Sequence, residues 1–203
     1  MEFDVKNIKG HNIILINNML DEDEIDSFWN LFNTIKPEDW LDPSKSNSAV
    51  TTDGKLQKKN RAIFPQEVDY LTDHKFLNTV VVKYFRGLYA LTEQEYFSKD
   101  SVYNSACYTN WDNHLISYYE DGDEYTAHKD SSLLTLLFWL HKQPKQFDGG
   151  ELYLPELDTT IPCKYNTGII FPSFLLHGVN PVVMNETSDQ DAGRICYTIF
   201  CGH

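Results

Sequence analysis

The chain has 203 residues, of which 41% are hydrophobic and 14% aromatic, a composition that supports a compact core and excludes extensive disorder. Its 17 basic residues stand against 30 acidic ones, so the formal net charge is -13 at pH 7. This negative field repels phosphate backbones and anionic lipid, and we therefore expect neither a nucleic-acid partner nor a membrane partner.

The cysteines and the apolar runs bear on where the protein works. Cys107, Cys163, Cys196 and Cys201 lack the paired spacing of a zinc site or a disulfide framework, so we expect free thiols in a reducing compartment. The chain does not open with a basic stretch followed by an apolar one, and no run approaches the roughly 20 apolar residues of a membrane span. We expect a soluble, cytoplasmic protein.

The first 100 residues predict a mainly helical support. Asp21 and Glu24 have the spacing of a capping box, and the apolar residues that follow at helical spacing predict an amphipathic helix that ends by Pro37. A second apolar stripe, over 77–88, predicts a helix packed on the outside of a sheet. Between these helices the polar stretch 41–61 reads as a surface loop rather than a basic binding arm. Its basic residues are Lys55, Lys58, Lys59 and Arg61.

Beyond about residue 113 the apolar pattern changes from helical spacing to two-residue alternation. The segments with this pattern, separated by turn-forming sequences, are 115–119, 125–128, 133–140, 151–154, 160–163, 168–171 and 195–201. Many short strands at this density predict a sandwich or a jelly roll. We expect a single domain over 1–203, mainly β with supporting helices, in which 1–100 is the support and 101–203 the jelly-roll catalytic core.

Four polar residues stand among these apolar strands: His128, Asp130, His177 and Arg194. His128 and Asp130 are two residues apart at a predicted strand end, so their side chains point to the same side and can hold one ion. Two imidazoles and one carboxylate are the ligand set of non-haem Fe(II) oxygenases, which leaves positions free for a chelating 2-oxo acid and O2. The guanidinium of Arg194 offers bidentate contact to the far carboxylate of such an acid.

Other interpretations fit some of these residues. A His-x-Asp pair is common by chance, an isolated His177 is more often a core histidine, and Arg194 would be ordinary at a solvated strand end. A cupin-like metalloenzyme would use the same ligands with zinc or manganese for hydrolysis or isomerisation, without need of Arg194. A non-enzymatic jelly-roll module would hold no metal, and its polar residues would satisfy one another. The joint order of the four residues favours the oxygenase.

The sequence around these four residues resembles the 2-oxoglutarate- and Fe(II)-dependent dioxygenases, specifically their prolyl 4-hydroxylase-like branch. The matching segments are Tyr118–Asp130, Phe147–Leu152 and His177–Val182, followed by Arg194. The resemblance is close after Asn113 and much weaker before it. It implies a double-stranded β-helix in which His128, Asp130 and His177 bind iron and Arg194 pairs with the far carboxylate of 2-oxoglutarate.

The resemblance also implies the reaction and its cofactors. These are Fe(II), 2-oxoglutarate as co-substrate and O2, with ascorbate as an accessory reductant. An unactivated C–H bond would be hydroxylated while 2-oxoglutarate is decarboxylated to succinate and CO2. Prolyl residues of a protein or peptide are the leading substrate, although the same scaffold also hydroxylates other side chains and small molecules. The charge of -13 favours a neutral or basic peptide over an acidic one.

Further co-substrate contacts follow from the resemblance. It nominates Tyr118, whose hydroxyl in relatives reaches 2-oxoglutarate, and Thr198, four residues after Arg194 on the same side of the strand. Relatives offer a tyrosine hydroxyl from the third barrel strand, where this chain has only the indole N–H of Trp139. We expect Tyr125 to pack beside the first ligand as a pocket wall.

The sequence does not decide whether either of two segments forms a lid over the substrate pocket. The connection from His177 to Arg194 is longer than in relatives. The extra polar residues, 184–193, are expected to extend a hairpin. The aromatic stretch 103–111, with Tyr103, Tyr108 and Trp111, lies just before the β-core. Aromatic residues at this density are more often core residues than a lid over a substrate, so we expect them to pack.

Overall fold

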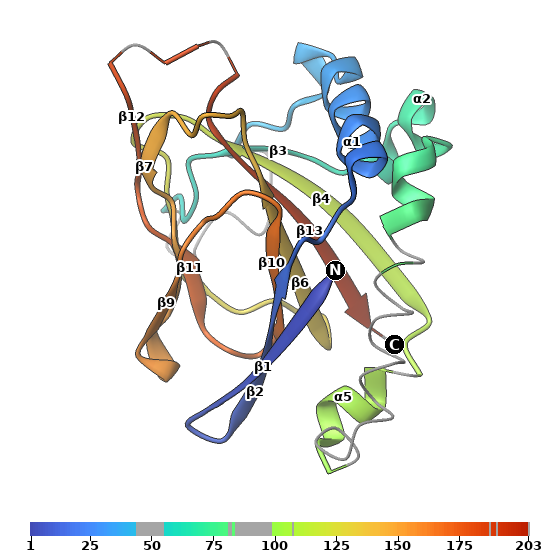
Figure 1. Cartoon of the computed structure of the whole chain (residues 1–203), viewed down its shortest axis with the longest axis vertical. Helices are drawn as coiled ribbons and strands as arrows, with labels where there is room; N and C mark the ends of the chain where they lie inside the picture. Colours follow the sequence, from blue (N-terminus) through green and yellow to red (C-terminus); the bar gives the residue numbers. More distant parts are fainter. Residues whose placement is uncertain are drawn as a thin grey trace.

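The computed structural model describes residues 1–43, 55–80, 83, 99–106, 108–186, 188–189 and 191–202. In this part of the chain, a large and a small β-sheet face each other, and helices cover the outer face of the large one (Figure 1). The arrangement is a double-stranded β-helix, or jelly roll, and the predicted fold class is confirmed.

The large sheet has the strand order β1-β2-β10-β6-β13-β4-β3, and each described pair of neighbours is antiparallel. Its strands are β1 Glu2–Ile8, β2 His11–Asn17, β3 Arg61–Ile63, β4 Trp111–Tyr119, β6 Leu134–Leu140, β10 Thr167–Pro172 and β13 Arg194–Gly202. β13 comes last in the chain yet lies inside the sheet, between β6 and β4. It contributes one face to the barrel interior and the other to the helical layer.

The small sheet has the order β5-β11-β8-β9, and β7 pairs separately with β12. These strands are β5 Tyr125–His128, β7 Phe147–Gly149, β8 Leu152–Leu154, β9 Thr159–Ile161, β11 His177–Val179 and β12 Val182–Met184. Apolar side chains of both layers, such as Leu137 and Leu152, form one buried cluster between the sheets. These apolar side chains exclude solvent from the space between the two sheets.

A second buried cluster joins the helices to the outer face of the large sheet. The helices are α1 Glu22–Thr34, α2 Asp69–Thr72 and α5 Ser101–Ala106, with short 3₁₀ turns at Pro37–Asp39, Pro65–Glu67 and Pro155–Leu157. The predicted capping box is present, since Asp21 and Glu24 exchange backbone and side-chain hydrogen bonds. α1 buries Phe28, whose ring lies 6.4 Å from that of Tyr197 in β13. Among the described residues, no helix is long and apolar enough to span a membrane.

Part of the second predicted helix is also seen. Residues 75–80 are helical, and Phe76, Leu77 and Val80 are buried in the same outer cluster. The rest of the stripe over 77–88 lies outside the described residues, apart from Lys83. The described cysteines, Cys163, Cys196 and Cys201, form no disulfide, as expected, and Cys107 is outside the described part.

The first 17 residues differ from the helical support expected there, because they form the β1–β2 hairpin. Lys9 and Gly10 connect the strands with φ angles of 49° and 85°, the left-handed backbone that suits a two-residue hairpin turn. β2 then pairs with β10, Thr167 lying opposite Asn17, and this joins the hairpin to the large sheet. The pairing of β2 with β10 joins segments far apart in sequence and leaves no local pattern, whereas Lys9 and Gly10 are a local turn signal for the hairpin itself.

Candidate active site

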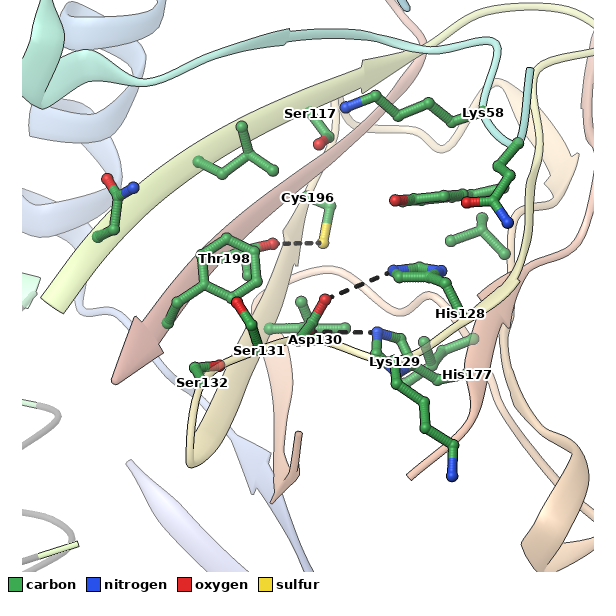
Figure 2. A pocket seen from close by; sticks show the side chains of 18 of the residues that line it. Lys58, Ser117, His128, Lys129, Asp130, Ser131, Ser132, His177, Cys196 and Thr198 are labelled. Carbon is green, nitrogen blue, oxygen red and sulfur yellow. Dashed lines mark hydrogen bonds and ion pairs between the residues drawn. The ribbon is translucent and has the colours of Figure 1, made fainter. Parts of the chain in front are cut away.

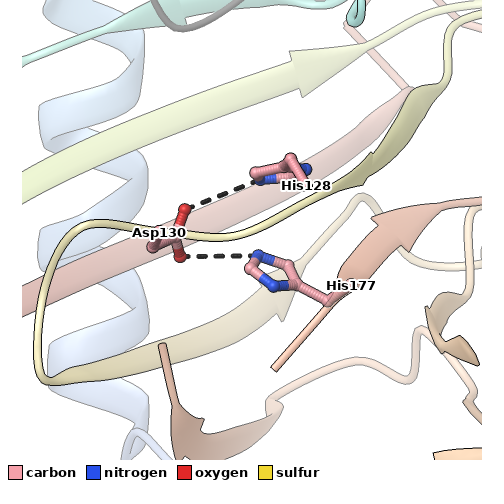
Figure 3. Close-up of side chains that lie close together, drawn as sticks. All are labelled: His128, Asp130 and His177. Carbon is pink, nitrogen blue, oxygen red and sulfur yellow. Dashed lines mark ion pairs between the residues drawn. The ribbon is translucent and has the colours of Figure 1, made fainter. Parts of the chain in front are cut away.

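Three side chains converge where the small sheet meets the barrel interior. His128 ends β5 and His177 begins β11, and the antiparallel register places the two residues opposite each other. Asp130 follows β5 and lies between them, with Oδ1 3.6 Å from His128 Nε2 and Oδ2 3.4 Å from His177 Nε2 (Figure 3). The three ligand atoms lie within 4.8 Å of one another. The structure thus brings together the residues that the sequence indicated as metal ligands.

Both imidazoles present the nitrogen that a metal needs. Nδ1 of His128 lies 3.0 Å from the carbonyl of Thr126, and Nδ1 of His177 lies 2.9 Å from that of Leu175. Because a carbonyl only accepts hydrogen bonds, each Nδ1 carries the proton and each Nε2 keeps its lone pair. Burial, together with the neighbouring His177, lowers the pKa of His128 to about 4. His128 is therefore neutral at pH 7, the form that binds metal.

A chain of hydroxyl groups fixes the carboxylate. Thr135 Oγ1 donates to Asp130 Oδ2 at 2.7 Å, and Ser173 Oγ lies 2.8 Å from Thr135 and 2.7 Å from Ser132. Burial acts to raise the pKa of Asp130, but the neighbouring His177 and the hydrogen bond from Thr135 outweigh it, so the pKa lies below its usual value. Thr135 was not predicted as a site residue, although a hydroxyl residue in the apolar run 134–140 was a usable signal.

Removing the hydroxyl of Thr135 tests this support. We expect Thr135→Val to weaken metal binding about 10- to 100-fold, the usual effect of losing a partner of a metal ligand, because Asp130 loses the bond that orients Oδ2. Titration of the metal-free protein with Mn(II) or Fe(II) measures the change. Thr135→Ser should restore affinity, and Thr160→Val, at an exposed position of β9, serves as the control. Unchanged affinity in Thr135→Val would show that the hydroxyl does not position the carboxylate.

A pocket of about 470 Å³ opens beside the triad (Figure 2). One wall comes from the inward faces of β4 and β13, where Cys196 and Thr198 follow Arg194 at two-residue steps. Thr198 therefore lies on the pocket side of its strand, as the sequence predicted. Tyr125 stacks on His128, with ring centroids 3.7 Å apart, and forms the expected wall next to the first ligand.

Arg194 is the most unusual residue of this wall, because its guanidinium is fully buried without an acidic partner among the described residues. Nε donates to the carbonyl of Gly150 at 2.7 Å, and the guanidinium lies 4.6 Å from the ring centroid of Tyr119. Nη1 and Nη2 are buried and lack a hydrogen-bond partner within the described structure. A buried cation is costly unless it is paired, so these N–H groups fit an anionic ligand.

The turn after β7 shapes the space for this arginine. Gly150 has a φ of +70°, and a Cβ atom there would lie 2.7 Å from Cδ of Arg194. A side chain at Gly150 would therefore displace the arginine as well as strain the turn. The second glycine of the Asp148-Gly149-Gly150 sequence thus has a direct role in placing the guanidinium.

Tyr118 lies on the other side of its strand, so the expectation that its hydroxyl reaches the co-substrate is wrong. Its ring packs in the outer cluster, 6.0 Å from Phe32 and 6.2 Å from Trp40, and its hydroxyl accepts the N–H of Gly193 at 3.2 Å. Tyr119 faces the pocket instead. Both faces of β4 are buried here, so polar and apolar residues do not alternate and the sequence does not indicate which tyrosine points inward.

The remaining aromatic residues divide between core and pocket. Trp139 lies in the cluster between the sheets, and its buried indole N–H has no partner within the described residues, but it is not among the residues that line the pocket. Tyr103 is a core residue rather than a lid, since its hydroxyl donates to the carbonyls of Asn12 and Ile170. Of the predicted aromatic stretch, Trp111 lines the pocket rim and Tyr108 is 78% exposed.

Comparisons with known proteins agree with this geometry. Residues 114–201 match the model of the 2OG-Fe(II) oxygenase superfamily. No curated protein matches the chain. A Trichoplax adhaerens prolyl hydroxylase, solved in complex with a hypoxia inducible factor oxygen degradation domain peptide fragment, is 14% identical with a TM-score of 0.60, covering 94% of this chain and 83% of its own.

Two further solved structures are similar over nearly their whole length. A Pseudomonas putida prolyl-4-hydroxylase is 12% identical with a TM-score of 0.57, covering 95% of this chain and 93% of its own. The protein OsALKBH1 is 14% identical with a TM-score of 0.58, covering 98% of this chain and all (100%) of its own. At these identities the likeness concerns the fold, which is prolyl 4-hydroxylase-like.

Proposed function

We propose that this protein, whose residues 114–201 carry the domain of the 2OG-Fe(II) oxygenase superfamily, hydroxylates a protein or peptide substrate, with a prolyl residue as the leading target. The superfamily uses Fe(II), 2-oxoglutarate and O2. One observation carries the proposal: a single pocket holds a His-Asp-His cluster and a buried arginine whose terminal N–H groups have no partner among the described residues. These are the two halves of a site for a metal and a dicarboxylate.

The side chains fit these groups in defined roles. His128 and His177 would hold iron through Nε2, and Asp130 through a carboxylate oxygen, which Thr135 orients. The Nη groups of Arg194 would donate to the far carboxylate of 2-oxoglutarate. When bound, Fe(II) and 2-oxoglutarate supply the oxidising power that inserts one oxygen atom of O2 into a C–H bond, with succinate and CO2 as co-products.

The pocket itself supplies orientation and protection from water. Leu137, Leu152 and Val179 line it with apolar surface, which limits the access of solvent to the reacting centre. The ring of Tyr119 lies against the guanidinium of Arg194. The Trichoplax adhaerens structure, which holds a peptide in the same fold, supports a peptide as the substrate here. Fold similarity alone does not select the residue that is hydroxylated.

The structure weighs against both alternatives raised by the sequence. A cupin-like metalloenzyme without 2-oxoglutarate has no use for a buried arginine, yet Arg194 lines the pocket at 0% exposure. A binding module was expected to satisfy its own polar groups, whereas Arg194 keeps buried N–H groups without partners among the described residues. The oxygenase accounts for both features.

An anaerobic titration tests the proposed function without knowledge of the substrate. Metal-free protein receives Fe(II) and then 2-oxoglutarate, and the visible charge-transfer band of an iron-bound 2-oxo acid is recorded. We expect a band that saturates with 2-oxoglutarate and is absent with Zn(II), which has no such transition. Folded, metal-loaded protein that gives no band would favour the cupin-like metalloenzyme with another ion.

A further inference from the structure

Lys58 is a buried lysine on the wall of the active-site pocket. It is 4% exposed, lines the pocket and forms no ion pair with a described acidic residue. Nearby cations behave differently: Lys59 pairs with Glu124 at 2.7 Å, and Lys129 pairs with Glu156 at 3.1 Å. Burial lowers the pKa of Lys58. A mostly buried lysine whose ammonium group faces a pocket is well placed to pair with an anionic ligand.

The backbone around Lys58 is held firmly against the strand that carries the first metal ligand. Lys58 forms a β-bridge with Tyr125. On one side the carbonyl of Gln57 accepts the N–H of Thr126 at 2.8 Å, and on the other the N–H of Lys59 donates to the carbonyl of Glu124 at 3.1 Å. Backbone pairing with the edge of β5 therefore fixes the position of Lys58.

The side chain is directed across the pocket. Nζ lies 5.8 Å from the ring centroid of Tyr125, and that ring stacks on His128. Figure 2 shows the lysine extending toward Ser117, with His128 between it and His177. The ammonium group thus lies in the same pocket as the triad, within reach of a substrate that approaches His128.

We propose that Lys58 binds the side-chain carboxylate of an Asp or Glu in the peptide substrate and so selects where on a peptide the enzyme acts. This inference rests on the proposed function. Arg194, which enters the pocket from β13, matches the carboxylate of 2-oxoglutarate. Lys58 lines the same pocket from a different segment and has no ion pair with a described acidic residue, so it is left for a second anion. A charged hydrogen bond in a pocket with little water is stronger than one at the surface.

The overall charge limits where this acidic residue occurs. A net charge of -13 opposes a strongly acidic partner, while Lys58 attracts one carboxylate at short range. The substrate is therefore a neutral or basic peptide with a single acidic residue near the hydroxylated position. An uncharged Asn or Gln of the same shape would leave the ammonium group unpaired.

Peptide libraries test the assignment. Acetylated and amidated peptides with randomised flanks, one library with a central proline and one with a mixed central residue, are treated with Fe(II), 2-oxoglutarate and O2. Mass spectrometry then identifies the oxidised products. We expect wild-type products to favour Asp or Glu over Asn or Gln at one position by about 10- to 100-fold, the effect of a hydrogen bond to a charged group. Lys58→Met should lose this preference, and Lys58→Arg should keep much of it.

Two controls distinguish the role of Lys58 from the proposed oxygenase function. Lys59→Met, on the same segment but exposed and paired with Glu124, should keep the acidic preference. The 2-oxoglutarate concentration that gives half of the anaerobic band should be the same in Lys58→Met as in wild type. This result would also show that the variant is folded. Products without acidic preference, or a preference that survives in Lys58→Met, would overturn the role of Lys58.

Two further outcomes have distinct meanings. A higher 2-oxoglutarate requirement in Lys58→Met would assign the lysine to the co-substrate and overturn its role in substrate selection. A normal wild-type band with no oxidised peptide from either library would contradict a peptide substrate. It would also overturn the proposed role of Lys58 in binding one. Loss of the band in wild type would instead count against the oxygenase itself.

Discussion

Asp130→Ala protein should fold but fail to retain Fe(II) and to turn over 2-oxoglutarate. Asp130 supplies the only carboxylate of the described triad and lies between Nε2 of His128 and Nε2 of His177. The loss should exceed the roughly 10- to 100-fold effect expected when only a partner of a ligand is removed. Metal content after anaerobic reconstitution and succinate release measure the two effects, and circular dichroism confirms the fold.

The control for this variant is Asp148→Ala, at an exposed position of β7. It removes the same chemical group outside the pocket and should bind Fe(II) like the wild type. Folding of Asp130→Ala is expected because Thr135 keeps a hydrogen bond to Ser173 at 2.8 Å after the carboxylate is gone. Retained turnover in Asp130→Ala would disprove the assignment of the triad as the iron ligands.

Arg194→Met should keep Fe(II) and lose affinity for 2-oxoglutarate by at least about 30-fold. The substitution preserves much of the buried stem and removes the terminal N–H groups that have no partner in the described structure. Truncating one member of a buried charge pair costs about 2–5 kcal/mol, and each 1.4 kcal/mol is a factor of ten in affinity. The 2-oxoglutarate concentration that gives half of the anaerobic band is the direct measurement.

Stability distinguishes a ligand-binding role from a structural one. Without 2-oxoglutarate the methionine variant avoids burying an unpaired charge, so its melting temperature should not fall below that of the wild type. Adding 2-oxoglutarate and Mn(II) should raise the wild-type melting temperature by mass action and raise that of Arg194→Met much less. Arg61→Met, which loses a surface pair with Glu120, is the matched control. A strongly destabilised Arg194→Met that binds 2-oxoglutarate normally would make the arginine structural.

The sequence located the metal site better than it located the surrounding contacts. His128 and Asp130 are two residues apart, and a strand fixes such neighbours on one side regardless of tertiary detail. Tyr118 was misplaced because β4 is buried on both faces, so no exposed face shows which residues point inward. The burial of Lys58 depends on pairing with Tyr125, far along the chain, which no local pattern reveals. The basic residues of the polar stretch 41–61 were therefore predicted to lie on a surface loop.

The secondary-structure elements that were predicted depend on local sequence patterns, whereas contacts between distant segments were missed. The capping box of Asp21 and the apolar stripe behind it predicted α1, since a helix is specified by neighbours three and four residues apart. The strands 125–128 and 195–201 were predicted from their two-residue alternation, and β5 and β13 form there. The β1–β2 hairpin was missed although Lys9 and Gly10 are a local turn signal, whereas its pairing with β10 joins distant segments and could not be seen locally.

The inner position of β13 has a consequence for how the protein is made. β4 and β6 emerge from the ribosome well before 194–202, and until that segment arrives each of them exposes an unpaired edge with apolar faces. Closing the sheet then joins segments far apart in sequence, a slow kind of step in which newly made chains can aggregate. His128, Asp130 and His177 are therefore synthesised before the barrel that brings them together is complete.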